Sequence, residues 1–329
     1  MKFCSFEIMD SVLSYVITNT EKRAVENLLV NGHRLDKRDF REPRPMKVSL
    51  SEGSSIVHLG KTIVSCHTTY TEEIPDENRP NEGLFSLSLA TPYRIDSQFR
   101  IEVLRSIKAA FIKTKALDLE SLVIKIGISC YHLNSEIVIL DNDGGLIDAC
   151  TASLAMSLLS LHIPGSRGPR PICLHHLPLS VTFFVYTPEI IVVDPTLLEA
   201  SITNPCFIQT SKPASITIFA NANGYVCGIS KTGGQSLPAS TLVSLMEHAI
   251  SVSTDWHIQL MEQMGNNAPT NLVLISSNAV KNAKKIAKEE KKEIEQYYHE
   301  EENDEKVEEE EEEEDMHDIN PELAAFLGI

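Results

Sequence analysis

The stretch DNDGGLIDACTASLAMSLLSL, residues 141–161, carries the strongest fold signal of the sequence. Gly144-Gly145 is a turn signal, and the apolar run after it is longer than an ordinary strand. The residues just before the turn, 136–140, have the apolar, β-branched composition of a strand. The stretch therefore predicts a strand that turns directly into a long apolar helix over residues 146–161.

Upstream of this turn we expect more strands and one helix. Pro43 and Pro45 exclude a helix and lead into an extended segment. Val, Ile and Thr runs on both sides of Gly60-Lys61 predict a β-hairpin, and apolar positions over residues 97–115 recur at helical spacing. The remaining strands are predicted at residues 46–50, 84–90, 121–133 and 136–140.

The second half of the sequence repeats this order. The runs LSVTFFVY, EIIVVD, SITIFAN and GYVCGIS predict four strands, and residues from Pro238 to about Gln263 predict a helix. We therefore expect an α+β fold of two similar βα halves, residues 32–165 and residues 166–266.

The two ends of the chain differ from this body. Residues 9–31 have the apolar spacing of an amphipathic helix, so residues 1–31 are predicted to pack on the body. Residues 267–303 are charged on all sides and predict a solvated helix. Residues 304–329 predict a disordered acidic tail that ends in the apolar motif INPELAAFLGI, typical of a peptide that docks on a partner. The glutamate run either mimics nucleic acid, binds a basic partner, or serves as a solubilising spacer.

Composition narrows the class of protein. Of the net charge of −17, the residues from Glu300 onward carry −14, so the body is close to neutral. The seven cysteines are scattered, with no CxxC pair, which indicates reduced thiols rather than disulfides or a zinc site. Because the N-terminus is too polar for a signal sequence and no apolar run is long enough to span a bilayer, we expect neither secretion nor a membrane anchor.

Ordered motifs along the body resemble the RNase PH family of 3′ exoribonucleases. RLDKRDFREPRP, residues 34–45, is similar to the family opening R-x-D-G-R-x-x-x-E-x-R-P, with Lys37 in place of the glycine. The agreement continues through VHLGKTIVSC, GLFSLSLA, the helix entry around Arg105, DNDGGLIDA and VVDPT, and it spans about residues 20–265. The turn NDGGLIDA and the segment LHHLPLSVTF resemble ring subunits of the eukaryotic RNA exosome, of the polymyositis/scleroderma autoantigen type.

This resemblance implies an RNase PH-like fold and a place in a hexameric ring through which RNA threads. The partners that it implies are a paired RNase PH-like subunit, the other ring subunits, cap RNA-binding subunits, hydrolytic nucleases with their cofactors, and RNA, but no membrane. It implies work in rRNA maturation and mRNA turnover, in the nucleus, nucleolus and cytoplasm. No metal or other cofactor is expected.

The same resemblance implies that the catalytic site has been lost. Active relatives hold phosphate with an arginine at a helix entry and a Gly-Thr-Arg or Gly-Ser turn, and they carry two carboxylates in the second half. In this sequence those positions fall on Phe99, Leu146, Ile147, Asp148, Ala200 and Cys206. We expect Asp148 to lie at the mouth of the pocket and repel phosphate, and therefore no enzymatic activity. The alternative is a phosphate-dependent 3′ exoribonuclease that is active together with a paired subunit.

Two groups of basic residues are candidates for RNA contact. Arg100, Arg105 and Lys108 lie within one predicted helix and are the RNA-binding residues that we predict, while the alternative is a solvated helix face. The arginines of residues 34–44 are expected to pair with the acidic residues between them. His175-His176 has no third ligand in view and is taken as structural.

Overall fold

The computed structural model of the chain describes residues 18–91, 97–165, 168–187, 189–202, 215–233 and 236–264. They belong to a compact unit that spans Met1–Val273. The start of the N-terminal helix near residue 9, the charged segment 267–303 and the tail 304–329 lie outside the described residues, so these remain predictions.

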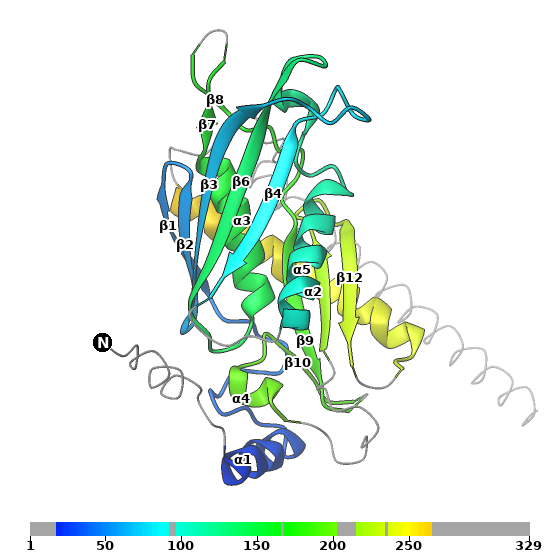
Figure 1. Ribbon diagram of the computed structural model, residues 1–329. Coiled ribbons are helices and arrows are strands. Elements are labelled where there is room, and N and C mark those ends of the chain that lie inside the picture. The colour runs from blue at the N-terminus through cyan, green and yellow to red at the C-terminus, as the bar shows by residue number, and fades with distance from the viewer. Residues whose placement is uncertain are drawn as a thin grey trace, which may run out of the picture. The chain divides into compact units, whose positions relative to one another are not determined.

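The first half of the unit is built on a six-stranded sheet (Figure 1). Its strands follow the order β1-β2-β3-β6-β4, with the short β5 paired to β6. Strands β4 and β6 run parallel and all other neighbours run antiparallel. A parallel pair needs a crossover connection, and helix α2 (Ser97–Ile112) provides it. The strands are β1 Met46–Ser51, β2 Ser54–Leu59, β3 Thr62–Glu73, β4 Leu84–Ala90, β5 Val123–Lys125 and β6 Ser129–Asp141.

The second half is built on a smaller antiparallel sheet of the order β10-β9-β11-β12. Helix α5 (Ala239–Met264) packs against β9 and β11 of this sheet and against β1 of the large sheet. These strands are β9 Leu179–Val185, β10 Ile191–Val193, β11 Ser215–Ala220 and β12 Val226–Thr232. The small ribbon of β7 His162–Ile163 and β8 Arg170–Pro171, the turn η1 Glu120–Leu122 and the helix α4 Leu197–Ala200 complete the described elements. The α+β class with two βα halves is confirmed.

The predicted break between strands 121–133 and 136–140 is wrong. Strand β6 runs without interruption through Asn134 and Ser135, the two residues between the predicted strands. Ser135 is buried, and its hydroxyl lies 2.9 Å from Oγ1 of Thr68 on the neighbouring strand β3. Thr68 Oγ1 in turn lies 2.7 Å from Oγ of Ser157 on α3. The hydroxyl of Ser135 therefore has a hydrogen-bond partner inside the core, and a sequence pattern cannot show such a partner.

Helix α3 (Leu146–Ser160) is the centre of the core. It contacts β2 and β3 of the large sheet and β9 of the small sheet, as Figure 1 shows. A helix that touches protein on all sides must be apolar all round, and α3 meets this condition with leucine, alanine and methionine. Ser153 and Ser157 of this helix are buried as well, and Ser157 donates a hydrogen bond to the carbonyl of Gly53 at 2.9 Å.

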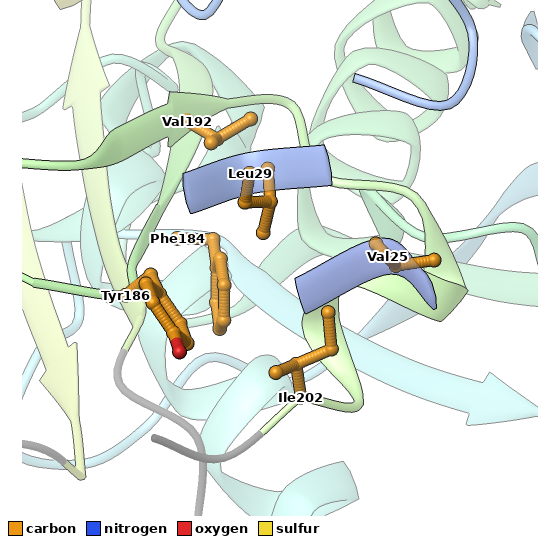
Figure 2. Packing of buried hydrophobic residues seen from close by; sticks show 6 residues of the cluster. All are labelled: Val25, Leu29, Phe184, Tyr186, Val192 and Ile202. Atoms are coloured by element: carbon orange, nitrogen blue, oxygen red, sulfur yellow. The ribbon is translucent and has the colours of Figure 1, made fainter. Parts of the chain in front are cut away.

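Helix α1 (Asn19–Val30) begins at a capping box, in which Thr18 and Glu21 bond reciprocally. Its apolar face packs beside α4 and the end of β9. Figure 2 shows this packing, and the cluster consists of Val25, Leu29, Phe184, Tyr186, Val192 and Ile202. Helix α1 thus packs on the second half of the unit.

Candidate functional site

The turn between β6 and α3 stands where active relatives are expected to hold phosphate. Gly144 and Gly145 have φ values of +87° and +63°, a left-handed conformation that costs other residues about 1–2 kcal/mol. A Cβ on Gly144 would collide with the carbonyl oxygen of Pro195, and one on Gly145 would lie 2.5 Å from Oδ1 of Asp194. The turn of the first half therefore packs directly against the second half.

Arg44 lies beside this turn and is bound on two edges of its guanidinium. Nε and Nη2 each donate to one carboxylate oxygen of Asp194, both at 2.7 Å. Nη1 donates to the carbonyl of Asp143 and Nη2 also donates to the carbonyl of Gly144, both at 3.1 Å. Asp194 is fully buried and Arg44 is 7% exposed. The positive charge nearest to the turn is therefore neutralised inside the protein.

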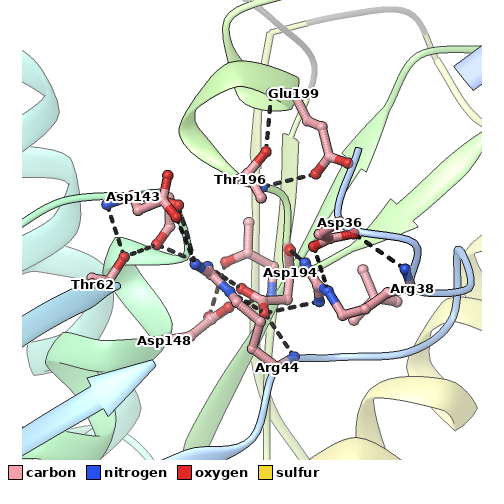
Figure 3. A network of polar contacts seen from close by, with 12 residues as sticks. Asp36, Arg38, Arg44, Thr62, Asp143, Asp148, Asp194, Thr196 and Glu199 are labelled. Atoms are coloured by element: carbon pink, nitrogen blue, oxygen red, sulfur yellow. Dashed lines mark hydrogen bonds and ion pairs between the residues drawn. The ribbon is translucent and has the colours of Figure 1, made fainter. Parts of the chain in front are cut away.

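Arg34 makes a second bidentate pair next to that of Arg44 and Asp194, which Figure 3 shows. Its Nε and Nη2 donate to the two carboxylate oxygens of Glu199 at 2.9 and 2.7 Å, and both side chains are fully buried. Arg38 bridges outward, with Nη1 3.3 Å from Oδ2 of Asp194 and Nε 2.6 Å from Asp36. We call this network of Arg34, Arg38, Arg44, Asp194 and Glu199 the arginine clasp.

The expectation that these arginines pair with neighbouring acids is confirmed for Arg38 and Arg34, whose Nε atoms lie 2.6 and 3.7 Å from the carboxylate of Asp36. Arg34 and Arg44 take as their closest partners Glu199 and Asp194, which lie more than a hundred residues away in the sequence. The reason is burial, because two guanidinium groups inside the protein need carboxylates that are buried with them.

Asp148 does not lie at the mouth of a pocket, and this expectation is wrong. Its carboxylate is 1% exposed and accepts hydrogen bonds from Oγ of Ser180 at 2.8 Å and from N and Oγ1 of Thr182, both at 2.9 Å. Burial, together with the nearby charge of Asp194, raises the pKa of Asp148 to about 7. Asp148 joins α3 to β9 and cannot meet a solvent phosphate.

The other positions at which we expected catalytic groups to be replaced differ in burial and belong to different helices. Leu146 is buried and Ile147 is half-buried in the first turn of α3. Phe99 is half-buried in the first turn of α2, and Ala200 ends α4. Cys206 lies outside the described residues.

The three predicted RNA-binding residues are all exposed on α2. Arg105 lines a groove of about 610 Å³ between α2 and the edge strand β12, whereas the residues that line this groove do not include Arg100 or Lys108. Of the three predicted residues, the structure thus places Arg105 in this groove. Contact of any of the three with RNA remains a prediction.

The groove contains two cationic residues that our sequence reasoning missed. Lys113 follows the last turn of α2, and Lys231 lies on β12. The spacing of Arg105, Ala109 and Lys113 at every fourth position was a readable signal, because such residues share one face of a helix. Lys231 had no signal in the sequence, since only the fold brings β12 next to α2.

Ser86, His132 and Glu73 stand in the order of a hydrolase triad on the outer face of the large sheet. Ser86 Oγ lies 2.7 Å from Nε2 of His132. Nδ1 of His132 is 2.9 Å from Oε1 of Glu73, but it makes no hydrogen bond within the described residues. Because a catalytic histidine needs that aligned bond to the acid, and because Ser86 and Glu73 are exposed on an open sheet, we regard this set as a surface cluster.

Metal and thiol chemistry find no support in the part of the chain that the structure describes. No group of three or more His, Cys, Asp or Glu side chains is placed to hold a metal there. Burial raises the pKa of Cys66 to about 12, so this thiol is not a nucleophile at neutral pH. None of the described helices has the length and apolar character needed to cross a membrane.

Comparison with known proteins identifies the family. The profile described as "3' exoribonuclease family, domain 1" matches residues 42–164. Exosome complex component rrp45 of Schizosaccharomyces pombe is 30% identical over 258 residues, which cover 70% of this chain and 85% of the relative. Exosome complex component RRP45A of Arabidopsis thaliana is 29% identical over 263 residues, which cover 71% of this chain and 83% of the relative.

A solved structure shares the fold. A chain of the Archaeoglobus fulgidus exosome with RNA bound to the active site matches with a TM-score of 0.65 and 24% identity, over 73% of this chain and 98% of the archaeal one. This match covers more of the chain than the family profile, which spans residues 42–164. The chain therefore belongs to the RNase PH-like 3′ exoribonuclease family, in the group that contains the exosome components of the RRP45 type.

Proposed function

We propose that this chain is a non-catalytic, RNA-contacting subunit of an RNA exosome ring, and that it supports 3′-to-5′ processing and degradation of RNA, including rRNA maturation and mRNA turnover. Its family membership supports the assembly, because the relatives compared above are exosome complex components by name. The partners in this proposal are a paired RNase PH-like subunit, the other ring subunits, cap RNA-binding subunits, hydrolytic nucleases and RNA.

One observation carries the non-catalytic part of the proposal. Phosphorolysis needs a free positive charge that holds a phosphate dianion next to an RNA phosphate. The position at which the resemblance implies the phosphate-binding arginine is Phe99 in this chain, and the guanidinium beside the α3 turn, that of Arg44, directs four of its five N–H groups to Asp194, Asp143 and Gly144. An anion entering this place would have to displace a buried carboxylate, which would itself be left unpaired.

The RNA-contacting part of the proposal rests on the exposed cations of α2, Arg100, Arg105 and Lys108. Each is a solvent-facing charge on a nearly neutral body, as a phosphate contact requires. Replacing all three by glutamate in the assembled ring should weaken binding of single-stranded RNA about tenfold or more and lower its dependence on salt. Lys47→Glu combined with Lys125→Glu is a charge-reversal control away from α2, since both lysines are exposed on the large sheet, and it should leave RNA binding close to that of the unchanged ring.

Assembly is tested by native mass spectrometry of the tagged chain purified from its own cells. The proposal predicts a complex with several different exosome subunits, and a chain that migrates alone or only with itself would contradict it. Deleting residues 300–329 should leave this complex intact. We also propose that the complex works in nucleus, nucleolus and cytoplasm, which imaging of the tagged chain would test.

The alternative function is a phosphate-dependent 3′ exoribonuclease that shares its site with a paired subunit. It predicts release of nucleoside diphosphates from RNA and phosphate that depends on side chains of this chain. Phosphorolysis by the chain with its paired subunit, compared with and without a substitution in the α3 turn, separates the two functions.

A further inference from the structure

The groove between α2 and β12 lies apart from the arginine clasp, none of whose residues line it. Its volume of about 610 Å³ is within the range of ligand sites in proteins. One wall is the face of α2 with Arg105, Ala109 and Lys113, the other is β12 from Cys227 to Thr232. Phe219 of β11 forms its apolar floor.

The β12 wall is the edge of a sheet. In the order β10-β9-β11-β12, no described strand pairs with the outer side of β12. An antiparallel strand bonded on one side only presents every second N–H and C=O group away from its neighbour. Ile229, with 46% of its surface exposed, lies on this strand within the groove. The groove therefore offers main-chain partners and an apolar contact to an extended chain.

The charge of the groove is positive. Arg105, Lys113 and Lys231 line it against a single carboxylate, Glu102. Within the described part of the chain, none of these three cations forms an ion pair. Lys231 donates to the carbonyl of Gly233 at 2.7 Å, which fixes its side chain without neutralising it. Three unpaired cations on a nearly neutral body favour an anionic occupant.

From the edge strand and its charges we infer that this groove binds an extended, acidic segment of a partner protein, which adds to β12 as a further strand and places its carboxylates against Lys113 and Lys231. Addition of a strand gives affinity through main-chain bonds, and the side chains of the groove give specificity. The inference does not depend on the proposed function, because the groove lies wholly within this chain.

Single-stranded RNA fits the groove less well than such a peptide. Proteins that hold single strands stack the bases on exposed aromatic rings. The aromatic ring of the groove, that of Phe219, is 2% exposed and lies under the other lining residues. The free edge of β12 presents C=O groups as well as N–H groups, and only another polypeptide strand pairs with both. RNA is therefore the competing outcome in the test and not the proposal.

The test measures binding of a fluorescein-labelled peptide that alternates glutamate and valine to the full chain, by fluorescence anisotropy at low and moderate salt. Binding should be detected, should weaken with salt, and should fall about tenfold or more in the Lys113→Glu, Lys231→Glu variant. The Lys47→Glu, Lys125→Glu variant has the same change in charge outside the groove and should bind like the unchanged chain.

Two further peptides distinguish addition of a strand to β12 from simple electrostatic attraction of an acidic peptide. A peptide with lysine in place of glutamate, and an acidic peptide with proline at alternate positions, should each bind at least tenfold more weakly. Amide hydrogen exchange of the unchanged chain should slow along residues 226–232 when the acidic peptide binds. Equal binding of the proline peptide, unchanged exchange of β12, or complete displacement of the peptide by an equal concentration of oligo-adenylate RNA would overturn the inference.

Discussion

The arginine clasp and the α2/β12 groove use the same kinds of side chain in opposite ways. In the clasp, Arg34 and Arg44 are buried and each makes a bidentate pair with a buried carboxylate. In the groove, Lys113 and Lys231 are exposed and form no ion pair with any described residue. The clasp joins the two βα halves of the fold, whereas the groove leaves its charge available to a partner.

The difference indicates which cations of this chain can bind an anionic partner. A buried pair that loses one partner costs several kcal/mol, so its arginine cannot exchange a carboxylate for a passing phosphate. An exposed lysine can acquire a partner at almost no cost, because water already solvates it. We therefore expect substitutions in the clasp to change stability and substitutions in the groove to change binding.

The largest effect is expected for Gly144→Ala, in the turn that the clasp holds. The variant combines a left-handed conformation with a collision between the new methyl group and the backbone at Pro195, and it should lose about 4 kcal/mol or more of unfolding free energy. Urea unfolding would measure this. Gly224→Ala is the control, since Gly224 has φ +83° but no atom within 4 Å of the new methyl group. It should lose only about 1 kcal/mol, and equal losses would mean that the packing of the turn contributes nothing.

The second largest effect is expected for Asp194→Asn, which should lower the unfolding free energy by about 3 to 5 kcal/mol. The variant leaves the guanidinium of Arg44 buried without its counter-charge. Denaturant unfolding at neutral pH measures the loss. The exposed pair of Arg79 and Glu82 is the control, and Glu82→Gln should change stability by less than about 1 kcal/mol. If Asp194→Asn were as mild as Glu82→Gln, the clasp would not be what joins the two halves.

The titration of Asp148 should have an effect of intermediate size on the unfolding free energy. Burial raises its pKa to about 7 in the folded chain, whereas the carboxyl of an unfolded chain titrates near pH 4. Between these values the folded chain retains a proton that the unfolded chain releases, so stability falls as the pH rises, by about 1.4 kcal/mol per pH unit. From about pH 5 to pH 7 the unchanged chain should lose roughly 2 to 3 kcal/mol relative to Asp148→Asn. If the unfolding free energies of the unchanged chain and of Asp148→Asn changed in parallel over this pH range, the carboxyl of Asp148 would be ionised in the folded chain at every pH measured.

The smallest effect on stability is expected in the groove. Lys113→Glu and Lys231→Glu replace exposed side chains and should each change the unfolding free energy by no more than about 0.5 kcal/mol. Thermal unfolding with each variant measures this. A loss comparable to that of Asp194→Asn would show that the groove is part of the folded core.

Most of the fold could be predicted from the sequence, because its signals are local. The turn at Gly144-Gly145, the apolar run of α3 and the alternation of LFSLSLA each depend on residues next to one another. The break that we predicted within β6 failed for the opposite reason. Ser135 is polar in the sequence but inward-facing in the structure, where Thr68 of another strand satisfies it.

The candidate site could be predicted only in part. The motif of residues 34–45 located the arginines of the clasp, yet their partners Asp194 and Glu199 come from the other half of the chain. No spacing rule connects residues so far apart. Asp148 was placed at a pocket mouth because its position follows a phosphate-binding turn, and only the packing of α3 against β9 shows that it points inward.

The most direct test of the account is phosphorolysis by the full chain together with its paired subunit, with single-stranded RNA and inorganic phosphate. The probe is Ile147→Glu, which places a negative charge in the half-buried first turn of α3 without touching the clasp. The account predicts that the rate of nucleoside diphosphate release is the same with the variant as with the unchanged chain. This rate is zero if the pair is inactive, and it comes from the partner subunit if the pair is active. Release that disappears with Ile147→Glu, while the pair stays assembled, would show that phosphate is held at this turn and would contradict the account.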